Sequence, residues 1–226
     1  MTTPSHRLFS PLKMGLGLGM ILTMLGYLWP RQALAHHFMD GSSQVGFVTG
    51  LLSGLAHPVI GIDHLAFIVA IGCISLNLPR FWLVSASFVA ASTLGVLIYL
   101  WFPGQSGYET AIALSVILVG TLLALRSGWS GASQTLATGI GLSLLAGLAG
   151  ILHGYGYGEA IIGTQTSAIL AYLLGLAIIQ TMIAWGSHAL GRSLCRQFST
   201  TQSFRYGGIS IAAVGLLVLV SHLSMG

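Results

Sequence analysis

Long apolar runs separated by short polar breaks dominate this chain of 226 residues. An apolar run of about 20 residues is long enough to span a bilayer as an α-helix. The pattern predicts an all-α membrane protein whose six transmembrane helices lie near 45–75, 81–102, 109–126, 134–157, 160–190 and 207–224. The first and fifth runs exceed the length that a bilayer requires, so these two helices are expected to tilt, kink or break.

Composition supports this class of protein. Charged residues make up 5% of the chain and hydrophobic residues 54%, with a mean hydropathy of +0.88. So few charges would leave the surface of a soluble domain of this size largely apolar. The breaks between the runs are too short to hold a further domain, so residues 36–226 are expected to form a single six-span domain.

The first 35 residues have the pattern of a cleavable signal peptide. Arg7 and Lys13 precede a short apolar stretch at 14–29, and Ala33-Leu34-Ala35 is an A-x-A cleavage signal. The alternative is an uncleaved first transmembrane helix. After cleavage the chain would begin with His36 and His37, whose imidazoles and free amine form a plausible weak chelator of Ni²⁺ or Cu²⁺. The alternative for this segment is a polar tail.

The distribution of charge predicts the orientation. The arginines of residues 36–226 all follow the first, third and fifth runs, whereas Asp40, Glu109 and Glu159 lie at the opposite connections. Basic residues accumulate on the cytoplasmic side, so both ends of the processed chain are expected outside the inner membrane of a bacterial cell, or of a thylakoid in a photosynthetic organism. Since no basic run is present, the high isoelectric point does not indicate nucleic-acid binding.

The segment His57-Pro58-Val59-Ile60-Gly61-Ile62-Asp63-His64 places ionisable groups inside the first apolar run. Such groups are costly in hydrocarbon and mark functional sites, and imidazole with carboxylate suits a divalent transition metal. On a straight helix, His57 and His64 would lie about 10 Å apart along the axis. A break at Pro58 and Gly61 would bring them together and turn Asp63 inward. The alternative is a structural role, with both imidazoles bonded to neighbouring helices.

A second group of candidate ligands lies in the fourth and fifth runs. His153 opens an alternating series of glycines and tyrosines that ends at Glu159, and both side chains are candidates to complete the site. The glycines favour an unwound backbone with exposed carbonyls, or alternatively an outer loop with interfacial aromatics. His188, near the inner end of the fifth run, is an exit ligand or a helix-packing residue. The two cysteines, Cys73 and Cys195, form no metal-ligand spacing.

An internal repeat is a further possibility. Residues 51–56 resemble residues 144–149, and extending this match pairs Gly61 with Gly154. Spans three apart run in opposite directions, so the repeat would be an inverted one of three plus three helices, an arrangement common among transporters. The alternative is chance similarity between segments rich in Leu, Gly and Ala.

The segment 57–64 resembles the signature H-P-x-x-G-x-D-H of the HupE/UreJ family of hydrogenase and urease accessory proteins. The resemblance implies a nickel permease with about six spans, in which nickel handling depends on His57, Asp63 and His64. The family's second motif looks like F-H-G-x-A-H-G-x-E. His153 matches its first histidine, but Tyr157 replaces the second and Glu159 comes one position early. His188 resembles a histidine of the family's fifth span.

The leading hypothesis is therefore a secondary permease, not an enzyme, that imports Ni²⁺ and supplies the maturation of hydrogenase or urease. Its partners would be the metal ion, the bilayer and maturation proteins of nickel enzymes. Transport of Co²⁺, Cu²⁺ or Zn²⁺ by the same architecture is the nearest alternative, because donor types alone do not select nickel. A zinc-dependent intramembrane hydrolase, with Asp63 as base, and a haem carrier with paired histidines are two others.

Overall fold

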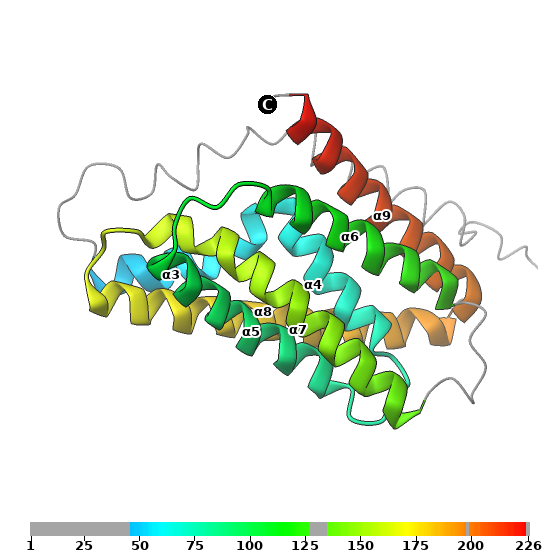
Figure 1. The fold of residues 1–226 in the computed structure, drawn as a ribbon. Coiled ribbons are helices and arrows are strands. Elements are labelled where there is room, and N and C mark those ends of the chain that lie inside the picture. Colours follow the sequence, from blue (N-terminus) through cyan, green and yellow to red (C-terminus); the bar gives the residue numbers. More distant parts are fainter. Residues whose placement is uncertain (1–45, 127–134, 198, 225–226) are drawn as a thin grey trace, which may run out of the picture.

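The computed structural model describes residues 46–126, 135–197 and 199–224, which form helices and contain no strand. The predicted signal peptide at 1–35, and the candidate ligands His36 and His37, lie outside the described residues. The helices are α3 (Phe47–Ile60), α4 (Ile62–Ile74), α5 (Trp82–Trp101), α6 (Tyr108–Leu125), α7 (Leu136–Gly158), the short 3₁₀ helix η3 (Glu159–Ile161), α8 (Thr166–Gln197) and α9 (Thr200–Leu223) (Figure 1).

The helices confirm an all-α architecture and show a break within the first apolar run. Each of α5 to α9 is long and apolar enough to cross a membrane, and α3 and α4 pass the same test together, which makes six spans if the bent pair is a single span. The two halves of this span meet at a bend of 78°. Pro58 lies in the last turn of α3, and Gly61 between the helices adopts an extended conformation. A Cβ at Gly61 would lie 2.5 Å from the His64 ring, so the break has room only for glycine.

Two predictions about the backbone are wrong. The predicted connection between the fifth and sixth spans, residues 192–206, is almost entirely helical, because α8 continues to Gln197 and α9 begins at Thr200. This stretch contains neither glycine nor proline, so helix continues through most of it and is interrupted only between Gln197 and Thr200. The glycines of 152–158 do not unwind α7, which remains helical to Gly158. They instead let neighbours approach, since a Cβ at Gly154 would overlap the Ser92 backbone and one at Gly158 the Tyr99 ring.

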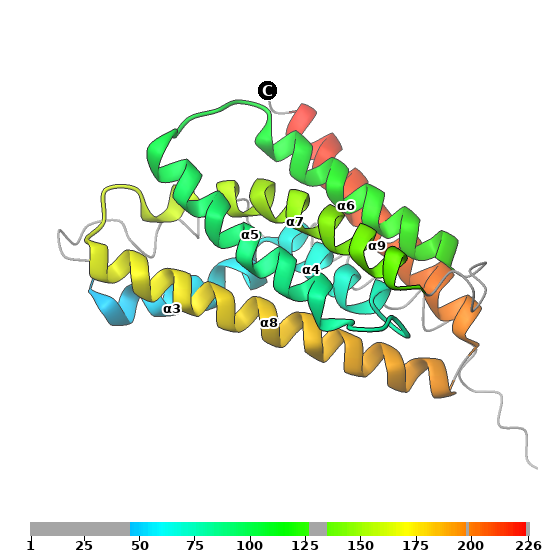
Figure 2. The same ribbon diagram turned by 60° about the horizontal axis from the view of Figure 1, so that its bottom comes forward.

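The helices associate closely in the pairs α3 with α8, α5 with α7 and α6 with α9. Figure 1 shows α9 alongside α6, and Figure 2 shows α3 alongside the first half of α8. In lipid, small residues permit such approach of two backbones. Gly54 faces the Tyr172 backbone, Gly154 that of Ser92, and Gly208 that of Ala124.

These contacts support the inverted repeat but in a different register. Two glycines of α3 face Ala168 and Tyr172 of α8, and two of α7 face Phe88 and Ser92 of α5 in the same pattern. The equivalent glycines are Gly50 with Gly150, Gly54 with Gly154, and Gly95 with Gly175. The sequence comparison paired Gly61 with Gly154, whereas the packing pairs Gly54 with Gly154, so the two alignments differ by seven residues. In the structural register His57 is equivalent to Tyr157, and their ring centroids lie 5.1 Å apart, between the two halves.

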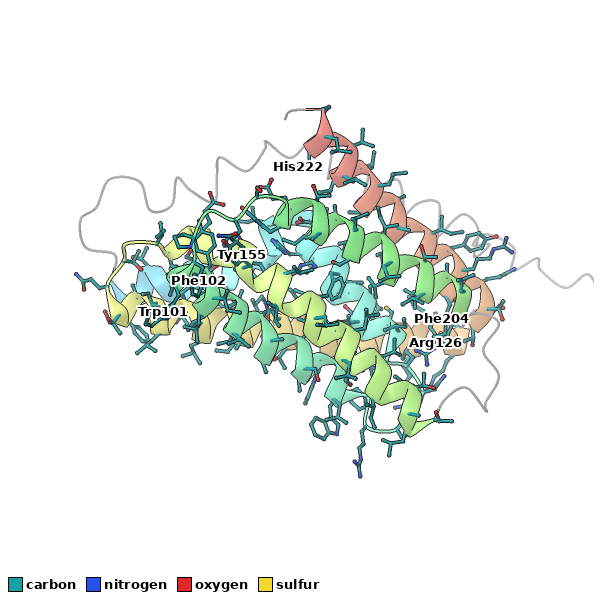
Figure 3. All side chains as sticks on the ribbon, in the orientation of Figure 1. Trp101, Phe102, Arg126, Tyr155, Phe204 and His222 are labelled. Carbon is teal, nitrogen blue, oxygen red and sulfur yellow. The ribbon has the colours of Figure 1, made fainter. Side chains whose placement is uncertain are left out.

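The two ends of the helical domain differ in character. Figure 3 shows Arg126 and Phe204 at one end and Trp101, Phe102 and Tyr155 toward the other, and the Arg126 guanidinium lies 5.3 Å from the centroid of the Phe204 ring. We call the first of these ends the arginine end. It is the end that the charge distribution predicts to be cytoplasmic.

Labelling of introduced cysteines tests this orientation. In a Cys73→Ser/Cys195→Ser background, a membrane-impermeant maleimide added to intact cells is expected to label Gln105→Cys and not Asn77→Cys. Both positions are exposed, and they lie in connections at opposite ends of α5. Permeabilised cells supply the control, because both variants should then react. Labelling of Asn77→Cys alone in intact cells would reverse the predicted orientation.

Candidate metal site

Three imidazoles gather where the first span breaks. His57 lies in the last turn of α3, His64 in the first turn of α4, and His153 in α7. The ring centroids of His57 and His64 are 6.2 Å apart, and those of His64 and His153 are 4.9 Å apart. The bend therefore brings His57 and His64 much closer than the roughly 10 Å that a straight helix would impose.

A chain of hydrogen bonds determines where His64 carries its proton. Ser115 Oγ donates to the Ile112 carbonyl oxygen at 2.7 Å, so it accepts from His153 Nε2–H at 2.9 Å. A neutral imidazole protonated at Nε2 has its lone pair at Nδ1. His153 Nδ1 thus accepts from His64 Nδ1–H at 2.7 Å. The lone pair of His64 is consequently at Nε2, the position from which an imidazole can bind a metal.

The same reasoning applies to His57 through a different helix. The Tyr172 hydroxyl donates to the Tyr157 carbonyl oxygen at 2.9 Å, so it accepts from His57 Nδ1–H, also at 2.9 Å. The lone pair of His57 is therefore at Nε2. A histidine that binds a metal almost always donates its other N–H to such a partner, which fixes both the tautomer and the ring orientation. His57 and His64 both have this arrangement, whereas both ring nitrogens of His153 are engaged with protein atoms.

Asp63 supplies negative charge beside the imidazoles. Its Oδ1 accepts a hydrogen bond of 2.8 Å from the backbone N–H of His64, and the side chain is half-buried in the first turn of α4. A carboxylate is favourable at this position because the helix N-terminus carries partial positive charge. The carboxylate also interacts electrostatically with the His64 imidazole and with the Tyr157 hydroxyl.

Aromatic rings enclose the three histidines. The Tyr157 ring lies 4.3 Å from that of His64, and Phe67 and Phe88 lie 4.6 Å and 5.6 Å from His153, all between centroids. The Tyr157 hydroxyl is buried, and Gln180 is near enough to interact with it, but no hydrogen bond of normal geometry joins the two groups. Buried hydroxyls are normally paired with protein, water or ligand, so Tyr157 provides beside His64 a polar group that can also bond the water of a hydrated ion.

The structure does not bring the other candidates to this position. Glu159 is exposed and accepts a hydrogen bond of 3.1 Å from the Tyr108 hydroxyl, and His188 lies toward the arginine end, with Nδ1 3.1 Å from Ser75 Oγ. Within the described residues, no group of three or more His, Cys, Asp or Glu side chains converges closely enough to hold a metal. Sequence reasoning missed Ser115 and Tyr172, whose polar groups in the middle of apolar runs were the available signal.

The family model described as HupE / UreJ protein matches residues 22–218. The chain belongs to the HupE/UreJ family. Protein HupE of Rhizobium leguminosarum bv. viciae is 26% identical to it over 174 residues, which cover 76% of this chain and 85% of that protein. No solved structure matches the chain. The HupE/UreJ match includes the whole of α3 to α8, so every residue of the histidine site lies within the family region.

Proposed function

We propose that the protein is a secondary permease that carries a divalent transition metal, with Ni²⁺ as its substrate in the cell, across the membrane through the site at His57, Asp63 and His64. The observation that carries the proposal is the pair of imidazoles at the broken span, each with its Nδ1–H engaged by a buried partner and its lone pair at Nε2. HupE/UreJ proteins are associated with nickel or cobalt transport and with accessory roles for hydrogenase and urease, which agrees with this function.

The donor set suits transport better than permanent binding. A structural metal site encloses its ion with four converging ligands, whereas this site consists, among the described residues, of imidazoles and a nearby carboxylate that do not converge in that way. An ion held by so few protein groups keeps part of its water and can leave. Discontinuous helices at the interface of inverted repeats are also the usual position of substrate sites in secondary transporters.

Polar side chains continue from this site along α8 toward the arginine end. Tyr172, Gln180 and His188 follow one another at intervals of eight residues, or about 12 Å of helix. Each lies within hydrogen-bonding distance of a polar side chain on another span: Tyr172 with His57, Gln180 with Ser92, and His188 with Ser75. This series supports a route by which the ion crosses from the histidine site to the cytoplasmic side.

Uptake of radiolabelled nickel tests the proposal. Cells lacking their own nickel transporters are expected to accumulate nickel when they produce the protein, and not when they produce Asp63→Asn at equal membrane abundance. Asparagine retains the shape of the side chain but removes the charge that offsets the cation. Excess cobalt or copper, added as competitor, reports which ion the site prefers. Wild-type protein that carries none of these ions would overturn the permease assignment.

Removing one hydroxyl should weaken the site without unfolding it. Tyr172→Phe leaves His57 Nδ1 without the oxygen that orients it, and the loss of an outer partner of this kind typically lowers metal affinity by about 10- to 100-fold. The expected result is a corresponding rise in the nickel concentration at half-maximal uptake. Tyr155→Phe is the matched control, because its hydroxyl bonds Phe102 and Gln105 away from the site. An equal effect of both substitutions would contradict the role assigned to Tyr172.

A further inference from the structure

The contact between α4 and α8 at the arginine end brings together the two cysteines of the chain. Cys73 lies in the last turns of α4 and Cys195 in those of α8, and both are half-buried against the same apolar cluster. Their separation in the sequence gave no ligand spacing, so only the packing of α4 on α8 reveals the pair.

Glycine makes this approach possible. A Cβ placed on Gly191 would lie 3.6 Å from Cys73 Sγ, so the thiol of α4 rests against the α8 backbone there. Cys195 is one helical turn further along α8, about 6 Å away, and residues four apart share a helix face. The Cys73 thiol is also 3.8 Å from the Ser187 carbonyl oxygen. Cys73 Sγ therefore lies in the seam between α4 and α8, and Cys195 is near enough to interact with it electrostatically, while its own thiol also hydrogen-bonds Thr200 at the start of α9.

His188 lies on the same face of α8, seven residues before Cys195. Ser75 Oγ donates to the Gly72 carbonyl oxygen at 2.8 Å, so it accepts from His188 Nδ1–H. The lone pair of His188 is thus at Nε2, and stacking on Phe81 at 4.1 Å between centroids holds the ring. This is the arrangement found at His57 and His64, repeated on the cytoplasmic side of the route.

A positive charge lies beside both thiols. Arg126 follows α6, is buried and donates to the Leu76 carbonyl oxygen. Its guanidinium is near enough to Cys195 and Cys73 to interact with both electrostatically. The guanidinium offsets only part of the cost that burial imposes on a thiolate at either cysteine, and thiolate is the form that binds metal.

We propose that Cys73 and Cys195 form a second metal site, which binds a soft cation between two thiolates at the cytoplasmic end of the α4–α8 seam, with His188 as the group preceding it on the route. Among the residues that the structure describes, no third ligand converges with the thiols, and the site closes by rotation of the two cysteine side chains. Binding of the cation displaces the thiol protons to water, and no electron is transferred. The role of the site as an exit station rests on the proposed permease function, whereas metal binding by the thiols does not.

Cadmium is the probe, because its thiolate complexes have an ultraviolet charge-transfer band. The chain has only two cysteines, so any such band in the purified, reduced, full-length protein arises from Cys73, Cys195 or both. Wild type is expected to develop the band in proportion to added Cd²⁺ until one ion is bound per chain. Cys73→Ser and Cys195→Ser are each expected to lose it, and His57→Gln to retain it.

Two outcomes overturn the thiol site: no band in the wild type, or an undiminished band in either serine variant. If the serine variants do not fold, Gly191→Val provides a second test, because its side chain would enter the seam beside Cys73 Sγ and should abolish the band while both thiols remain. Nickel uptake is measured on the same variants. Cadmium binding by a protein that carries no nickel refutes the permease alone, and nickel uptake without a cadmium band refutes the thiol site alone.

Discussion

His64→Gln is expected to abolish nickel uptake while the protein remains folded in the membrane. Glutamine fills a similar volume and its amide can still donate to His153, but it offers no imidazole lone pair for a metal. Loss of an outer partner alone costs up to about 100-fold in metal affinity, so loss of a ligand should exceed this. His57→Gln should have the same effect, since the two imidazoles occupy the two sides of the break.

His222→Gln is the matched control for these substitutions. His222 pairs with Glu109 at 2.9 Å, at the end of the domain opposite the arginines, and takes no part in the histidine site. Nickel uptake at equal membrane abundance should therefore be close to that of wild type in this variant. Uptake that survives in both His64→Gln and His57→Gln would remove these residues from the route.

Gly154→Leu is expected to have the largest effect on stability. A Cβ alone at this position would overlap the Ser92 backbone, and α5 lies there along the full length of the contact with α7. Overpacking commonly costs about 1–3 kcal/mol, and a backbone cannot move aside as a flexible side chain does. The variant should aggregate or unfold in detergent at a markedly lower temperature than wild type, and its His153 should no longer meet His64.

Gly141→Ala controls for the loss of a glycine from the same helix. No atom lies within 4 Å of a Cβ built at Gly141, so the added methyl group meets open space. Alanine is favoured over glycine in a helix interior by about 0.5–1 kcal/mol, so this variant should be unchanged or slightly more stable. Equal destabilisation by the two substitutions would show that α7 needs glycine for another reason than its approach to α5.

The sequence alone was sufficient to predict the features that depend on neighbouring residues in the chain. Runs of apolar residues predicted the spans, because hydrocarbon requires every backbone group to be paired within a helix. Pro58 and Gly61 predicted the break in the first span, because one lacks an N–H and the other permits the tight turn past the His64 ring. His57, Asp63 and His64 stood out because ionisable groups are rare at such a depth.

Only the tertiary structure decided how these groups are oriented and which others join them. The partners of His64 and His57 come from α7, α6 and α8, and the two hydrogen bonds that set their tautomers join residues 89 and 115 positions apart. The register of the repeat and the meeting of Cys73 with the α8 backbone likewise depend on which glycines face which helix. The spacing of apolar residues and the composition of each segment determine where the helices form. Contacts between helices depend on the shapes of both helix surfaces, so the sequence of one segment cannot specify them.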